Sequence, residues 1–157
     1  LSLIMFYFQK GEFKKAMRLF SKFYHTDKWY IQKGGQEWTM KKGLIEILLH
    51  LELGNIDVFE SRLYSFKRIY FDYLREIGQD KAIRYLSFVE DYYKDPDQVA
   101  SQDFFEKVEN SFDWVGREYE DIFVMSFYAW LKSKMDNKDL YEVTLELVKR
   151  KTLNPPA

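Results

Sequence analysis

The sequence has no cysteine and, in 157 residues, only three prolines and seven glycines. Without cysteine the chain can form neither a disulfide framework nor a thiolate metal site, which fits a reducing compartment. A β-sandwich or barrel would need a turn every ~8–12 residues, and so few glycines and prolines do not suffice for that. We therefore expect a cytoplasmic protein that is not built from many short strands.

Long apolar runs are also missing. The longest, near residues 3–8, is far shorter than the ~20 residues that a transmembrane helix needs, so we expect no membrane span. The chain starts at Leu1 without a methionine, and its start has neither the basic segment nor the cleavage site of a signal peptide. We expect a single domain over residues 1–157, cut from a longer chain.

Aromatic residues, by contrast, are abundant at 19%, within a hydrophobic fraction of 46%. Apolar side chains recur every three or four residues along most of the chain, which is typical of amphipathic helices. One such stripe is formed by Tyr141, Leu145 and Val148. No segment shows the strict alternation of a half-buried strand, so the pattern predicts an all-α fold.

Helix-breaking sequences recur at near-constant intervals. Gly11-Glu12, Gly54-Asn55, Asp95-Pro96 and Asp136-Asn137 follow one another after 43, 41 and 41 residues. A period of this size is typical of stacked helical hairpins. We predict four hairpins, with first helices over residues 1–10, 38–53, 80–94 and 117–135 and second helices over residues 12–25, 56–77, 97–112 and 138–151.

Residues 7–20, YFQKGEFKKAMRLF, contain an aromatic pair, the turn residue Gly11, the small Ala16 where two helices would cross, and Phe20 four residues later. This segment resembles the helix–turn–helix core of a tetratricopeptide repeat. The later hairpins resemble it in period and polarity, although only Ala100 keeps the small residue at the position of Ala16. The resemblance implies a right-handed solenoid of about four antiparallel helical hairpins.

The resemblance also implies a function, because such repeats hold a partner peptide or protein in a groove lined by their first helices. Aromatic residues with polar atoms are enriched at binding hot spots, but core residues of helices follow the same spacing. Each aromatic candidate is therefore a groove residue or a core residue. The register of the repeat places six candidates for partner binding in the groove: Lys41, Tyr85, Tyr92, Tyr93, Trp130 and Lys134. We expect a non-catalytic interaction scaffold or regulatory module.

Patterns that would carry chemistry are few. Glu46 and His50 lie four residues apart on one helix face and could share a metal, but we favour a hydrogen-bonded His50 at a helix interface. The sequence contains no Gly-x-Ser-x-Gly elbow and no glycine-rich phosphate loop. We therefore expect no enzyme activity, no cofactor and no metal.

The charges are unevenly distributed. Residues 1–75 contain 13 Lys and Arg against 8 Asp and Glu, whereas residues 76–157 contain 11 against 17. A basic stripe from Lys14 to Lys22, with Trp29 and Trp38 nearby, could track a phosphate backbone and stack bases. The overall pI near 6.2 argues against a nucleic-acid partner. Nucleic-acid binding through the basic half is therefore the second alternative function.

The first alternative is structural: self-association, as a homodimer or an array segment, through the apolar helix Leu1–Phe8. Met5 and Phe8 would lie on the contacting face. For the hydrophobic core we expect Phe6, Phe13, Ala16, Phe20, Ile47, Leu48, Leu63, Phe66, Leu86, Phe104, Phe105, Phe127 and Leu145.

Overall fold

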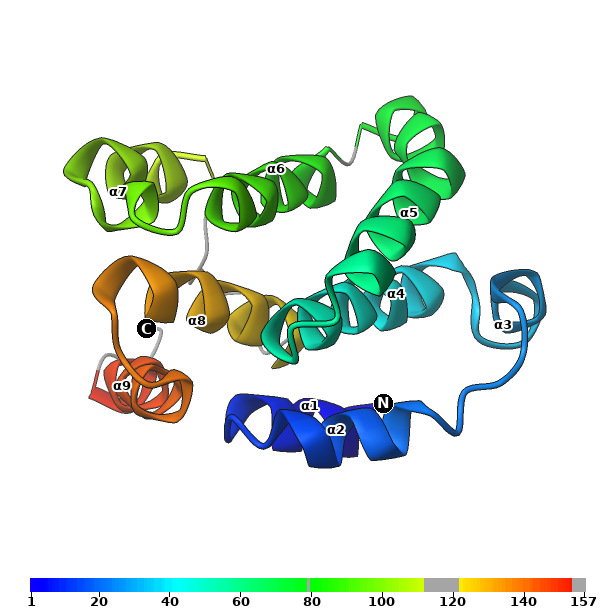
Figure 1. The fold of residues 1–157 in the computed structure, drawn as a ribbon, viewed down its shortest axis with the longest axis horizontal. Helices are drawn as coiled ribbons and strands as arrows, with labels where there is room; N and C mark the ends of the chain where they lie inside the picture. The colour runs from blue at the N-terminus through cyan, green and yellow to red at the C-terminus, as the bar shows by residue number, and fades with distance from the viewer. Residues whose placement is uncertain (79, 112–121, 154–157) are drawn as a thin grey trace. The chain divides into compact units, whose positions relative to one another are not determined.

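The structure is a computed structural model that describes residues 1–78, 80–111 and 122–153, with side chains up to residue 150. This part of the chain contains nine α-helices, one short 3-10 helix and no strand, so the prediction of an all-α fold is confirmed (Figure 1). The elements are α1 (Ser2–Gln9), α2 (Phe13–Phe20), α3 (Asp27–Gly34), α4 (Gln36–Glu52), α5 (Ile56–Glu76), α6 (Lys81–Lys94), η1 (Gln98–Ala100), α7 (Gln102–Glu109), α8 (Ile122–Asp136) and α9 (Leu140–Leu153).

The chain divides into two compact units. Unit 1 comprises Leu1–Phe8 and Glu12–Ile83, and unit 2 comprises Gln9–Gly11 and the chain from Arg84 onward. Unit 1 thus contains α2 to α5 and nearly all of α1, while unit 2 contains α7 to α9 and most of α6.

Unit 1 is built around the pair α4 and α5, which makes the most extensive helix contact in the described chain. Gly43 lies directly under the ring of Phe66, where a Cβ atom would come within 3.0 Å of it. α2 and α3 also pack on α4. The core of this unit is formed mainly by apolar residues, and these large side chains are completely or almost completely buried: Met5, Phe8, Ile45, Ile47, Leu48, Leu49, Phe59 and Tyr70.

Three of the four predicted hairpin turns share one geometry. Gly11, Gly54 and Asn137 all have positive φ angles, of 69°, 70° and 49°. In each turn the following residue donates its backbone N–H to the carbonyl five residues back: Glu12 to Tyr7, Asn55 to His50, and Lys138 to Ser133. This is the Schellman ending of a helix, and the left-handed conformation that it needs suits glycine and, less often, asparagine. α1, α4 and α8 therefore end alike, at the breaks that the sequence period predicts.

The sequence predicts no helix between residues 25 and 38, and this prediction is wrong, because α3 occupies most of that stretch. The Thr26 side chain caps this helix by accepting a hydrogen bond from the backbone N–H of Trp29, at 3.3 Å. Asp27 follows in the first turn, where a carboxylate is favoured by the helix dipole. The predicted helix over residues 12–25 correspondingly ends earlier, since α2 stops at Phe20.

The helix predicted over residues 97–112 is shorter than expected. Asp95 accepts hydrogen bonds from the backbone N–H groups of Asp97 and Gln98, but only the 3-10 helix η1 follows. α7 then begins after Ser101, whose hydroxyl accepts from the N–H of Phe104 at 3.2 Å. The first part of the predicted helix over 117–135 lies outside the described residues, and α8 is described from Ile122.

In unit 2, α8 is buried over two complete turns. All eight residues from Ser126 to Ser133 are buried. The hydroxyls of Ser126 and Ser133 donate to carbonyls of their own helix, those of Ile122 and Trp130, and so need no solvent. The ammonium group of Lys132 pairs with the carboxylate of Asp136 one turn later, at 3.0 Å.

Two of the expected core residues are exposed, Phe6 at 49% and Leu145 at 39%. On α9 the buried face is instead formed by Leu140, Val143, Thr144 and Leu147, so the stripe with Tyr141 and Val148 lies on the opposite, exposed face. On α1, Ile4, Met5 and Phe8 are buried, and Leu3 and Phe6 are exposed. Met5 and Phe8 are therefore core residues, and any self-association through α1 would have to use Leu3 and Phe6.

Candidate functional site

The six residues predicted to bind a partner fall on three helices. Tyr85, Tyr92 and Tyr93 lie on α6, Trp130 and Lys134 lie on α8, and Lys41 lies on α4. α6 from Arg84 onward and α8 belong to unit 2, whereas Lys41 belongs to unit 1. The structure thus gathers five of the six candidates in one unit.

Tyr92, Trp130 and Lys134 form a compact cluster. The rings of Tyr92 and Trp130 meet edge to face, with centroids 5.5 Å apart and an angle of 88° between their planes. The ammonium nitrogen of Lys134 lies 5.4 Å from the centroid of each ring. Trp130 is completely buried, while Tyr92 and Lys134 remain partly accessible. A cation held at two aromatic rings is a recurrent recognition element, and each such contact is favourable by about 0.5–2 kcal/mol.

Tyr85 occupies a core position. Its hydroxyl donates to the carbonyl oxygen of Phe127 at 3.0 Å, and its ring lies 5.6 Å from the ring of Phe127. This side chain is buried, so its role is to fix α6 against α8. Going along α6 from Tyr85 to Tyr92, the contacts move along α8 from Phe127 to Trp130, and the two helices therefore run in the same direction.

Lys41 and Tyr93 do not join this cluster. Lys41 pairs with Glu37 one turn earlier on α4, with 2.9 Å between Nζ and Oε1. This is an ordinary ion pair at a helix surface. Tyr93 is half-buried on α6, next to Tyr92 in the sequence.

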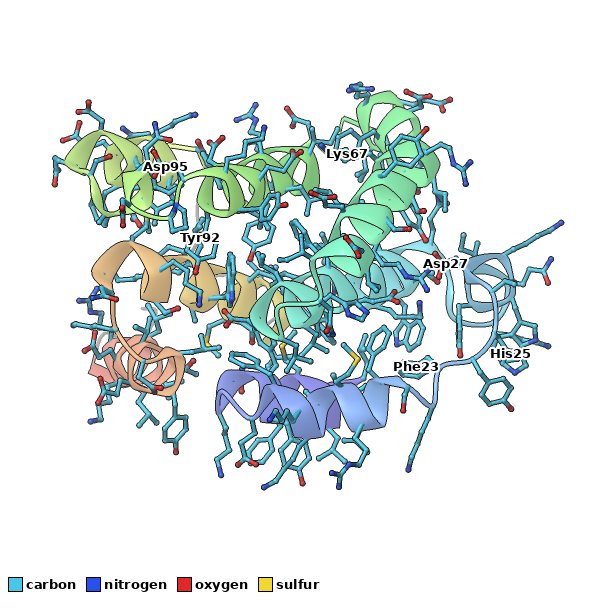
Figure 2. The ribbon with its side chains drawn as sticks, in the orientation of Figure 1. Phe23, His25, Asp27, Lys67, Tyr92 and Asp95 are labelled. Atoms are coloured by element: carbon cyan, nitrogen blue, oxygen red, sulfur yellow. The ribbon has the colours of Figure 1, made fainter. Side chains whose placement is uncertain are left out.

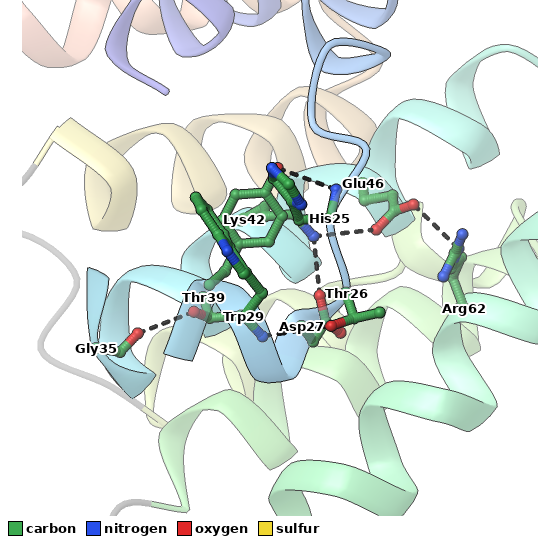
Figure 3. A network of polar contacts seen from close by, with 10 residues as sticks. His25, Thr26, Asp27, Trp29, Gly35, Thr39, Lys42, Glu46 and Arg62 are labelled. Atoms are coloured by element: carbon green, nitrogen blue, oxygen red, sulfur yellow. Dashed lines mark hydrogen bonds and ion pairs between the residues drawn. The ribbon is translucent and has the colours of Figure 1, made fainter. Parts of the chain in front are cut away.

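A second cluster, which the sequence does not reveal, lies in unit 1 around Lys42 (Figure 3). Lys42 is only 4% exposed. Its ammonium nitrogen lies 3.0 Å from Oδ1 of Asp27 on α3 and 3.9 Å from Oε2 of Glu46 on α4. The rings of Phe20 and Tyr30 flank it, with centroids at 5.5 and 5.2 Å. We name Asp27, Lys42, Glu46 and Arg62 the buried ion cluster after Lys42, its buried member; Asp27 and Glu46 are half-buried, and Arg62 is exposed.

Glu46 extends the buried ion cluster to α5, because its Oε1 lies 3.0 Å from Nε of Arg62. Burial raises the pKa of the Glu46 carboxyl, and the cations of Arg62 and Lys42 oppose this rise. Each buried charge in the cluster thus faces an opposite charge, as buried ions require. The arrangement joins three helices, and nothing in it positions a nucleophile.

Tyr70 is a further buried polar group of unit 1. It is 1% exposed, and its hydroxyl has no hydrogen-bond partner. Burial raises the pKa of this hydroxyl, and the carboxylate of Asp27 raises it further. The neutral hydroxyl is therefore the form that the fold stabilises.

His50 has the structural role that the sequence favours. Its Nδ1 lies 3.3 Å from the side-chain nitrogen of Asn55, across the turn between α4 and α5. Glu46 is engaged with Arg62 and Lys42 instead. No group of three or more potential metal ligands occurs in the described part of the chain.

Sequence reasoning could place Tyr92, Trp130 and Lys134 together because they share a repeat register. It could not find the pair of Lys42 and Asp27, because the two residues are 15 positions apart and Asp27 lies on α3, a helix that the sequence does not predict. The one local signal was the spacing of Lys42 and Glu46, which suits a pair on one helix face.

Within the residues that the structure describes, no helix is both long and apolar enough to cross a membrane. Compared with known proteins, the chain matches no family model, no curated protein and no solved structure. The functional argument therefore rests on the geometry of the chain itself.

Proposed function

We propose that this protein is a non-catalytic interaction module of the helical-repeat type. It binds a partner protein or peptide at the surface of α6 and α8, where Tyr92 and Lys134 are accessible. The observation that carries the proposal is the cluster of Tyr92, Trp130 and Lys134, whose rings and ammonium group are fixed against one another before any partner arrives.

Two further features support a repeat architecture. α1, α4 and α8 end in the same kind of turn, at Gly11, Gly54 and Asn137, as equivalent helices of successive hairpins would. α6 and α8 run in the same direction, which is how first helices of adjacent hairpins pack in a tetratricopeptide-like solenoid. These features favour such a solenoid, with α6 and α8 as neighbouring first helices.

The chemistry of the cluster fits a binding hot spot. The buried ring of Trp130 contacts the ring of Tyr92 and restricts its motion. The Tyr92 side chain therefore loses little entropy when a partner binds. Tyr92 offers a flat apolar face and a hydroxyl, while Lys134 offers N–H donors. A partner segment that combines an apolar side chain with a carbonyl or carboxylate oxygen satisfies both.

The proposal is tested by placing a photo-crosslinking phenylalanine analogue at Tyr92 in the full chain, expressed in the source cell. The same analogue at Tyr64, an exposed tyrosine on α5, is the matched control. We expect one discrete crosslinked protein from the Tyr92 position and none from the Tyr64 position.

Affinity then decides whether the crosslinked protein uses the cluster. Replacing Tyr92 by Ala or Lys134 by Gln should weaken its binding by about tenfold or more, as truncation of a hot-spot residue does. Trp130 is left intact, because its removal would open a cavity in the core. Equal binding by wild-type and Tyr92→Ala protein of unchanged helicity would refute the proposal.

A further inference from the structure

A second surface lies in unit 1, in the connection between α2 and α3. Three aromatic side chains are exposed there, Tyr24, His25 and Trp29, and Tyr24 is 81% exposed. The ring of His25 stacks on that of Trp29, with centroids 3.9 Å apart and planes within 16°. The ring of Tyr24 contacts the imidazole from a tilted position, with centroids 4.4 Å apart and 40° between the planes. We name these three residues the ring stack (Figure 2 labels His25).

The ring stack rests on an ordered base. The backbone N–H of Trp29 is bonded to the capping hydroxyl of Thr26, and the N–H of His25 points to the hydroxyl of Tyr30 at 3.5 Å. Tyr30 is buried and its ring contacts those of Phe23 and Trp38. The stacked rings are therefore held in place without a ligand, although exposed aromatic surface costs free energy in water.

The neighbouring charges are almost all positive. From Phe13 to Gly35 the chain has six Lys and Arg residues and one acidic residue, Asp27. Asp27 bonds to buried Lys42, so its charge is neutralised locally. Exposed cations follow at four-residue intervals on α2 and just beyond its end, and continue on α3: Lys14, Arg18, Lys22, Lys28 and Lys33.

We propose that the ring stack and these cations form a binding surface for a single-stranded nucleic acid. Exposed aromatic faces stack unpaired bases, and a line of cations beside them follows the phosphates. A duplex would leave the rings unused, since its bases are already stacked. The whole-chain pI near 6.2 does not oppose this, because the acidic residues that lower it are concentrated in residues 76–157.

This surface and the proposed protein-binding cluster consist of different residues, the first in unit 1 and the second in unit 2. The two proposals can therefore be tested independently. Tyr92→Ala should leave nucleic-acid binding unchanged, while variants of the ring stack should leave the crosslink at Tyr92 unchanged.

The test measures fluorescence anisotropy of a labelled oligothymidylate about twelve nucleotides long, at about 50 mM salt, with the full chain. Arg18→Glu/Lys22→Glu should reduce affinity at least tenfold and reduce the slope of log affinity against log salt concentration by roughly 0.7 for each phosphate that is no longer neutralised. The matched control is Lys81→Glu/Lys94→Glu on α6, which changes the net charge equally and should bind like wild type.

The ring stack is tested with Tyr24→Ala, which cannot disturb the core because the side chain is almost fully exposed, and with Tyr24→Ala/Trp29→Ala. We expect an affinity loss of about fivefold or more for each base that is no longer stacked, with an unchanged salt slope. A duplex of the same length should bind more weakly than the single strand.

Three results would overturn the proposal. The first is the absence of saturable binding to the oligothymidylate. This holds also if a glutamate-rich peptide binds the surface in its place. The second is equal affinity of wild-type and Tyr24→Ala/Trp29→Ala protein, and the third is an equal loss of affinity in the α6 charge control.

Discussion

At the scale of single residues, Lys42 shows how a charged side chain can be accommodated in the interior of unit 1. Its ammonium group contacts Asp27 of α3 and Glu46 of α4, and Glu46 in turn contacts Arg62 of α5. Removing Lys42 and, in part, the carboxylates of Asp27 and Glu46 from water is costly, and the mutual attraction offsets the cost only while all partners are present. The buried ion cluster therefore fixes the position of α3 more than it adds net stability.

Replacing one charged residue of this cluster should accordingly destabilise the fold more than replacing two partners together. We expect Lys42→Met to destabilise the fold by about 3 kcal/mol or more, because Asp27 and Glu46 lose a buried counter-charge. In a double-mutant cycle with Asp27→Asn, the coupling energy from urea unfolding should be about 1–3 kcal/mol.

The matched control for that cycle is the exposed pair Lys138 and Glu146, whose atoms lie 3.1 Å apart. Its coupling should stay below about 1 kcal/mol, the usual limit for exposed ion pairs. Equal coupling in the two cycles would show that burial does not strengthen the Lys42 pair.

His50 gives the fold a dependence on pH. Burial lowers the pKa of its imidazole below the ordinary 6.5, and the nearby Arg62 cation lowers it further. The unfolded chain therefore binds a proton at a higher pH than the folded chain does, so stability from this residue is present above pH 6.5 and is lost as the pH falls through the folded-state pKa. The free energy of unfolding of wild type should fall more than that of His50→Gln on acidification from neutral pH.

Direct titration of His50 by NMR provides the check on this prediction. A folded-state pKa at or above 6.5 would contradict it. So would an identical acid loss of stability in wild type and His50→Gln.

At the scale of elements, the approach of α4 to α5 depends on Gly43. A Cβ at this position would lie 3.0 Å from Cδ2 and 3.2 Å from Cε2 of Phe66. In the register of the repeat the position of Ala16 is occupied in this hairpin by Phe59, which is buried in the second helix, while the small residue Gly43 lies in the first helix. In this hairpin the small residue that lets the two helices approach closely therefore lies on the first helix, α4, and not on the second, α5.

Substitutions at Gly43 should reveal this contact. Alanine normally stabilises a helix interior by about 1 kcal/mol relative to glycine, and we expect Gly43→Ala to gain less than that. Gly43→Leu should destabilise the fold by about 1–3 kcal/mol through overpacking. Urea unfolding measures both, and Phe66→Leu/Gly43→Ala should recover the gain relative to Phe66→Leu alone. Wild-type stability of Gly43→Leu would contradict this account.

The sequence predicts most elements because α4, α5, α6, α8 and α9 combine helical periodicity with clear breaks. It misses α3, since Gly34-Gly35 suggests a joint and the capping signal of Thr26 and Asp27 is short by comparison. It cannot decide which apolar face of α9 is buried, because both faces have helical spacing. Leu145 and Leu147 can be told apart only through the position of α8.

The candidate site was predictable to a similar extent. Register placed Tyr92, Trp130 and Lys134 close together, but the same spacing serves a core and a groove, so the burial of Trp130 and Tyr85 could not be foreseen. The ring stack and the buried ion cluster depend on α3 and on contacts between helices. Contacts between helices produce no periodic pattern in a single sequence, so the sequence does not predict them.

At the scale of the whole molecule, the chain forms two units, and unit 1 contains a core of its own. We expect residues 1–83 to fold without the rest of the chain, because the fully buried side chains of α4 and α5 have their neighbours within this unit. The fragment should show a helical circular-dichroism spectrum and a cooperative thermal transition.

A shorter fragment, residues 1–60, ends early in α5 and serves as the control. It lacks Leu63, Phe66 and Tyr70, which are buried, and it should not unfold cooperatively. An unfolded 1–83 fragment would show instead that the two units form one cooperative structure.

The complete burial of α8 from Ser126 to Ser133 also has a consequence in time. A backbone amide that no local opening exposes can exchange its proton with solvent only when the surrounding unit unfolds. These eight residues should therefore take up deuterium last among the described residues of unit 2, well after α7, in hydrogen-exchange mass spectrometry. Their exchange rate would then report the lifetime of the folded unit, since α8 would be the slowest-exchanging helix among the described residues of unit 2.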